Sequence, residues 1–147
     1  MRIPLIWILC CLALFGAMRA TQAAESSHPP AEAFSGEYIL IGRKPDSGAT
    51  YSGRVIFQQS KQKPDTFDVT RIVDGQTIRG SAFFDSVAGS DKIPVLRMRF
   101  LLEHYSYEGI YRWTSDPDNY FRLTGYVYLS GGSAKSPGLE ALFPCMK

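Results

Sequence analysis

Short runs of alternating apolar and polar residues follow one another from Phe34 onward, separated by clusters of Gly, Asp, Pro and Ser. A period of two places one face of a strand in a core and the other in water. After the first 17 residues, no stretch of ten residues has a clean helical period. The pattern therefore predicts consecutive antiparallel strands with short connections. We expect strands at 36–42, 51–59, 66–73, 76–84, 93–102, 105–113 and 120–129, and a short one at 139–143.

Turn residues fit these boundaries. Asp74-Gly75 lies between two alternating runs, which predicts a two-residue hairpin turn with Gly75 at positive φ. Lys63-Pro64-Asp65 and 116–119 (Asp-Pro-Asp-Asn) are comparable turn clusters.

Alternation also assigns the faces of three strands. In 93–102, the apolar side is opposed by Arg97 and Arg99. In 120–129, an apolar side opposes Arg122 and Thr124. The sides that we expect to face the core are Leu96, Met98, Phe100 and Leu102; Tyr105, Tyr107, Gly109, Tyr111 and Trp113; and Phe121, Leu123, Val127 and Leu129.

Seven or eight sequential strands form a meander, which tends to close because closure removes exposed edges. Glycines lie inside four of the expected strands, where they let a barrel strand bend: Gly53, Gly80, Gly109 and Gly125. The sequence thus predicts an all-β protein with one up-and-down barrel of about eight strands, with a β-sandwich as the alternative.

The first residues have the pattern of a secretory signal peptide. Met1-Arg2 precedes an apolar run over 3–17 and a small-x-small motif at 21–23. This run is shorter than the roughly 20 residues that span a bilayer, so we expect cleavage after Ala23 and no retained membrane segment. The expected organisation is a signal peptide at 1–23, a flexible leader at 24–33 and a barrel domain at 34–147, secreted or periplasmic.

Cleavage changes the charge and the cysteine count. The chain has 16 Lys+Arg and 14 Asp+Glu, and the signal peptide contains Arg2 and Arg19, which leaves 14 of each. A neutral chain gives no reason to expect nucleic acid as a partner. Cys145 is then the single cysteine, either a free thiol or half of an intermolecular disulfide.

A spaced series of glycines and aromatics runs through most of 34–143: Gly36-x-Tyr38, Gly42, Tyr51-x-Gly53-x-Val55, Gly80, Tyr107-x-Gly109-x-Tyr111 and Gly138-Leu139-Glu140-Ala141-Leu142. The series resembles small exported bacterial proteins of uncharacterised function, whose plan is similar to the calycin-type barrels, the lipocalins and avidins. The resemblance implies a barrel that binds a ligand. The chain departs from it in lacking a Gly-x-Trp opening, a C-terminal helix and an identifiable biotin-site pattern.

Two sets of residues are candidates for ligand binding. Tyr105, Tyr107, Tyr111 and Trp113 offer broad apolar area with polar tips, and they either line a cavity or fill a narrow barrel. Arg97 and Arg99, with Arg122 across a strand, either hold an anion or form a solvated outer face.

No catalytic or metal motif is present in the sequence. His28, His104 and Cys145 do not supply three or four convergent metal ligands, no Gly-x-Ser-x-Gly occurs, and 130–133 (Ser-Gly-Gly-Ser) lacks the Lys of a phosphate loop. Nothing in the sequence brings Glu103 and Glu108 together as paired carboxylates. We therefore expect no enzyme activity and no cofactor. The predicted role is binding of a small apolar or amphipathic ligand; the alternatives are a module that contacts an envelope or extracellular protein and an outer-membrane barrel.

Overall fold

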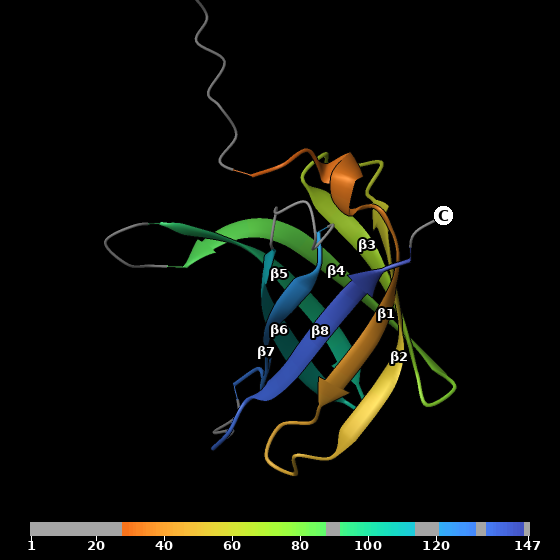
Figure 1. Ribbon diagram of the computed structural model, residues 1–147, viewed down its shortest axis with the longest axis vertical. Helices are drawn as coiled ribbons and strands as arrows, with labels where there is room; N and C mark the ends of the chain where they lie inside the picture. Colours follow the sequence, from red (N-terminus) through yellow and green to blue (C-terminus); the bar gives the residue numbers. More distant parts are fainter. Residues whose placement is uncertain (1–27, 88–91, 114–120, 132–134, 146–147) are drawn as a thin grey trace, which may run out of the picture.

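Eight antiparallel strands pair in chain order, and the last strand pairs with the first to close the sheet (Figure 1). The computed structural model describes residues 28–87, 92–113, 121–131 and 135–145. The elements are the 3₁₀-helix η1 (Ala31–Phe34) and the strands β1 (Gly36–Arg43), β2 (Thr50–Gln59), β3 (Thr66–Val73), β4 (Gln76–Val87), β5 (Ile93–Leu102), β6 (Tyr105–Trp113), β7 (Leu123–Leu129) and β8 (Gly138–Pro144). The prediction of an antiparallel up-and-down barrel is confirmed.

The strand boundaries follow from alternation and turn residues. β3, β5 and β6 begin and end where the sequence predicts. The prediction for β7 was wrong at its start: Phe121 has φ 58° and lies in a turn, so the strand begins at Leu123. β4 runs three residues further than expected, to Val87. The signal peptide, the turn cluster at 116–119 and part of the expected leader lie outside the described residues.

The hairpin between β3 and β4 turns at Asp74 and Gly75, whose φ values are 51° and 76°. Two consecutive positive φ angles match the right-handed twist of the flanking strands, which is why Asn or Asp followed by Gly is favoured there. The predicted turn is confirmed.

Side chains from the inward face of every strand form the core. The predicted core faces of β5, β6 and β7 point inward, with Leu96, Met98, Tyr111 and Leu123 completely buried. By alternation Tyr105 belongs to the inward face of β6, but it lies at the end of the strand beside the turn, where it is 58% exposed.

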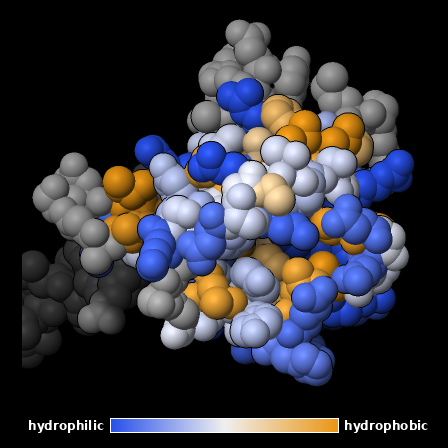
Figure 2. Space-filling model, turned by 90° about the horizontal axis from the view of Figure 1, so that it is seen from below, coloured by the Kyte–Doolittle hydropathy of each residue, from blue (hydrophilic) through white to orange (hydrophobic). Residues whose placement is uncertain are grey.

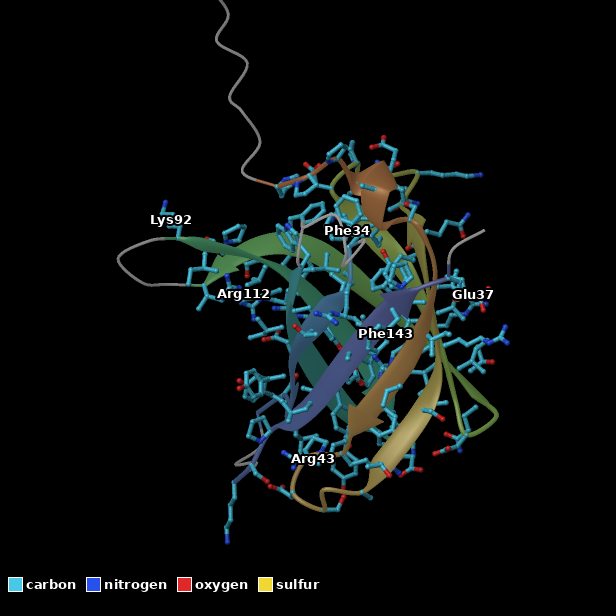
Figure 3. The ribbon with its side chains drawn as sticks, in the orientation of Figure 1. Phe34, Glu37, Arg43, Lys92, Arg112 and Phe143 are labelled. Atoms are coloured by element: carbon cyan, nitrogen blue, oxygen red, sulfur yellow. The ribbon has the colours of Figure 1, made fainter. Side chains whose placement is uncertain are left out.

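One end of the barrel is closed by η1, which joins the last residues of the predicted leader to Phe34, the first residue of the predicted barrel domain (Figures 1 and 3). Phe34 is fully buried, and its ring makes edge contacts with four others: Phe67, Phe84, Trp113 and Phe121. Local alternation did not indicate this contact, because the burial of Phe34 depends on the barrel beneath it.

The closed end is also tied to the wall. The Tyr38 hydroxyl donates a hydrogen bond to the Phe34 carbonyl at 3.1 Å, and burial raises the pKa of Tyr38 to about 12. Arg43 is the last residue of β1 and lies at the opposite end of the barrel (Figure 3).

Candidate functional site: a cavity at the open end of the barrel

The end opposite η1 holds a cavity of about 350 Å³. The β1–β2, β3–β4 and β5–β6 connections surround its entrance with hydrophilic residues, and this end is viewed in Figure 2. The apolar part of the wall consists of Val73, Ile78, Phe100, Leu102, Tyr107, Val127 and Leu129. The volume lies in the range of roughly 300–1,000 Å³ that is typical of small-molecule sites.

A buried charged pair lies beside the cavity, and its arginine lines it. Arg71 of β3 is 2% exposed and Glu140 of β8 is 4% exposed. Two parallel hydrogen bonds join them, from Nη1 to Oε2 at 3.1 Å and from Nη2 to Oε1 at 2.5 Å. This bidentate geometry compensates both charges where water cannot.

Two tyrosine hydroxyls complete the hydrogen bonding of this carboxylate. Tyr51 donates to Oε1 and Tyr111 donates to Oε2. We call Tyr51, Arg71, Tyr111 and Glu140 the polar floor; Tyr51 and Arg71 line the cavity. Each carboxylate oxygen thus accepts two hydrogen bonds, so Glu140 is fully satisfied.

The strand register explains how the tyrosines reach Glu140. Gly42 of β1 and Gly125 of β7 flank Glu140 on its two sides. Tyr51 is paired with Gly42, and Tyr111 is paired with Gly125, so the five residues form one row across five strands. A Cβ atom at Gly42 would lie 2.5 Å from the Tyr51 ring, so only glycine lets this ring lean across toward the carboxylate.

The shifted pKa values of Glu140 and Arg71 favour the charged form of both groups. Burial opposes ionisation of Glu140, but attraction to Arg71 and the hydrogen bonds from Arg71 and both tyrosines outweigh it and lower its pKa. Burial and the adjacent Glu140 carboxylate raise the pKa of Tyr51 and of Tyr111. Burial would lower the pKa of Arg71, yet Glu140 reverses this and raises it. At neutral pH the floor is an ion pair with two neutral phenols.

Two aromatic rings lie beside the Arg71 guanidinium of the polar floor. The Arg71 guanidinium lies 4.1 Å from the centre of the Phe100 ring. Tyr107 stacks on Phe100 with ring centres 5.4 Å apart and planes 8° from parallel. The cavity therefore has one planar aromatic wall.

The structure distributes the predicted aromatic set along the barrel. Tyr107 lines the cavity, Tyr111 belongs to the polar floor, Trp113 packs against Phe34 at the closed end, and Tyr105 is exposed. One set of residues thus contributes to both interpretations, a cavity wall at one end and a filled interior at the other.

The predicted arginine set lies outside the barrel. Arg97 is hydrogen-bonded to Asp85 and Glu108, and Arg99 to Glu108, on the outer face of β4 to β6. The structure does not bring these arginines to the cavity. Arg122 lies 5.9 Å from the centre of the outward Phe143 ring, also away from it.

Sequence reasoning missed Tyr51, Arg71 and Glu140 as site residues. A signal was present: Arg71 shares the phase of Phe67 and Val69, which are both buried. A charged residue in the phase of a core face is expected to have a buried partner.

Two further features lie on the outer surface. A groove of about 420 Å³ is lined by residues of β4 to β8 that include Val87, Ile93 and Tyr126. On β1 and β8, exposed Ile39 is paired with exposed Phe143. Within the described ranges, no group of three metal-ligating side chains is found and no helix is long and apolar enough to cross a membrane.

Sequence comparison gives no relative: no family model and no curated protein matches the chain. Among solved structures, the chain is similar to a redesigned β barrel, b11L5F_LGL, with a TM-score of 0.55 and 19% identity over 80% of this chain and 96% of that one. It is also similar to the redesigned barrel mFAP1, solved bound to DFHBI, with a TM-score of 0.56 and 19% identity over 79% of this chain and 99% of that one. A fluorescence-activating β barrel designed de novo is similar with a TM-score of 0.54 and 16% identity over 78% of this chain and 96% of that one. At these identities the similarity shows the fold alone, that of a closed β-barrel.

Proposed function

We propose that this protein is an exported barrel that binds a small amphipathic molecule non-covalently at its open end. The observation that carries the proposal is the cavity of about 350 Å³, with apolar walls and a satisfied polar floor, in a barrel whose other end is filled by Phe34. The similar barrel mFAP1, solved with DFHBI, supports the idea that this architecture accommodates a small molecule.

Binding rather than catalysis fits the chemistry of the floor. Both oxygens of Glu140 already accept two hydrogen bonds, which leaves no basic lone pair for a substrate proton. We therefore expect no turnover in screens of esters, glycosides and peptides. Turnover that a single substitution at His104 or Glu108 abolishes would refute this part of the proposal.

A fluorescence titration with the uncharged dye N-phenyl-1-naphthylamine tests the binding site. Leu129 lines the cavity, so Leu129→Trp should fill it and abolish the emission enhancement. Leu101 lies on the outer face and is 62% exposed, so Leu101→Trp is the matched control and should bind the dye like the parent. Equal binding by both variants, or no binding by the parent, would contradict the proposal.

Export is tested separately. The charged start, apolar run and small residues before Glu25 support cleavage. N-terminal sequencing of protein from the envelope or medium should find a first residue between Thr21 and Glu25. Intact Met1 in that material would contradict export by cleavage.

A second candidate role is contact with another envelope or extracellular protein. The exposed apolar residues Ile39, Ile41 and Phe143, on adjacent strands β1 and β8, favour it. A photo-crosslinking residue at Ile41 should capture one discrete partner in cells, whereas the same residue at exposed Arg79 of β4 should not. Absence of a specific adduct at Ile41 would rule against this role.

A further inference from the structure

We propose, as an extension of the proposed function, that the cavity selects flat aromatic molecules that donate a hydrogen bond and carry no negative charge. A buried arginine near a ligand cavity ordinarily suggests an anion receptor. Three observations of the cavity point the other way.

The first observation is the shape of the wall. Phe100 and Tyr107 both line the cavity, and their rings are 8° from parallel. Aromatic rings pack favourably against other rings, either offset-stacked or edge to face. Aliphatic residues, including Val73, Ile78 and Leu129, also line the cavity, so a planar apolar body can lie along the aromatic wall.

The second observation is the charge balance. Glu140 neutralises Arg71 through two hydrogen bonds, so the guanidinium carries no free charge toward the cavity. Its Nε has no hydrogen-bond partner among the described residues, and this nitrogen is buried. The cavity entrance has three acidic residues and one basic one: Asp46, Asp74 and Glu103 against Lys44. An anion would meet three negative charges at the entrance against the single positive charge of Lys44.

The third observation is the direction of the hydrogen bonds. Tyr51 lines the cavity, and its hydroxyl proton is donated to Glu140. The phenol remains protonated at neutral pH because burial and Glu140 raise its pKa. Because this proton is already donated to Glu140, the Tyr51 oxygen can bond to a ligand only through a lone pair. A ligand atom that bonds to it must be an N–H or O–H donor.

Calorimetry with four naphthalene derivatives of one shape tests this selectivity. The set is 2-naphthylmethylammonium, 2-naphthylmethanol, 2-(methoxymethyl)naphthalene and 2-naphthoate. The alcohol should bind roughly fivefold tighter than the ether, because one hydrogen bond contributes on that order. The ammonium should bind at least as tightly as the alcohol, and the naphthoate more weakly than the ether. A naphthoate that binds as tightly as the ammonium would overturn the inference.

Two variants locate the cause. Tyr51→Phe keeps the ring and removes the accepting oxygen, so the preference for alcohol over ether should disappear, while Tyr105→Phe on the exposed end of β6 should keep it. Asp74→Asn with Glu103→Gln should raise the affinity for naphthoate severalfold without weakening the ether. An unchanged alcohol preference in Tyr51→Phe refutes the acceptor role, even if the double variant behaves as expected.

The outcomes separate this inference from the function it rests on. If N-phenyl-1-naphthylamine binds at the cavity but the four compounds show no preference, the selectivity is wrong and the ligand-binding function stands. If neither the dye nor any of the four compounds binds, both are wrong.

Discussion

Replacing Arg71 with Met should strongly destabilise the barrel. The substitution keeps a long, flexible side chain against Phe100 but removes both hydrogen bonds and the counter-charge of Glu140. Only the tyrosine hydroxyls would then hold a carboxylate that is 4% exposed. Removing one partner of a buried ion pair costs about 3–5 kcal/mol, so we expect a loss of that size in the free energy of unfolding.

Urea denaturation at neutral pH, followed by circular dichroism, measures this loss. Arg99→Met is the matched control: Arg99 also bonds to a carboxylate, that of Glu108, but its side chain is 57% exposed. Exposed pairs contribute about 0–1 kcal/mol, so the control should change little. Adding Glu140→Gln to Arg71→Met should recover part of the loss because no bare charge remains buried. A loss below about 1 kcal/mol for Arg71→Met, or one equal to the control, would refute the coupling that we assign to the polar floor.

Three other predictions follow from the fold and the floor. Gly75→Val should cost roughly 1 kcal/mol or more, because a β-branched residue is strained at φ 76°, and an unchanged melting midpoint would refute this. Trp113→Ala should lower the free energy of unfolding measured in urea by about 3–5 kcal/mol, because the ring packs against Phe34 at the closed end. For the same reason the fluorescence emission of Trp113 in the native protein should be blue-shifted, and an emission maximum typical of water-exposed indole would contradict this placement. Because the pKa values of Tyr51 and Tyr111 are raised, the stabilisation that their neutral phenols contribute is present below pH 10.0 and should be lost as the pH rises beyond it. Because the pKa of Glu140 is lowered, the stabilisation that its carboxylate contributes is present above pH 4.5 and should be lost as the pH falls below it. Urea melts from pH 3 to 11.5 in which stability falls at neither end would contradict this.

The architecture could be predicted because it depends on local signals. The boundaries of β3, β5 and β6 and the turn at Asp74-Gly75 are set by alternation and turn chemistry within a few residues. Closure of the barrel was also predictable, since a meander of eight strands with in-strand glycines has few other ways to protect its edges.

The polar floor depends on contacts that local patterns do not specify. Arg71 and Glu140 are 69 positions apart in sequence, and only the closure of β8 onto β1 brings Glu140 level with Gly42 and Tyr51. The row across five strands becomes visible only once every register is known. Arg71 alternates with buried apolar residues, which indicates that it needs a buried partner of opposite charge. Local alternation does not indicate which residue that partner is.

Position along the barrel axis separated the aromatic candidates. Tyr107 and Trp113 share a face, but six residues at about 3.4 Å each place them roughly 20 Å apart. The first therefore lines the cavity, and the second packs at the closed end. Alternation reports which side of a sheet a residue occupies and not how far along the barrel it lies.

The most direct test of ligand binding at the open end is a map of amide chemical shifts as 2-naphthylmethanol is added to the protein. We predict that the largest changes cluster around the cavity, at Tyr51, Val73, Phe100 and Tyr107, while the resonance of the Trp113 indole N–H at the closed end does not shift. Changes centred on Trp113 and Phe34, or on the outward residues Ile39 and Ile41, would contradict it.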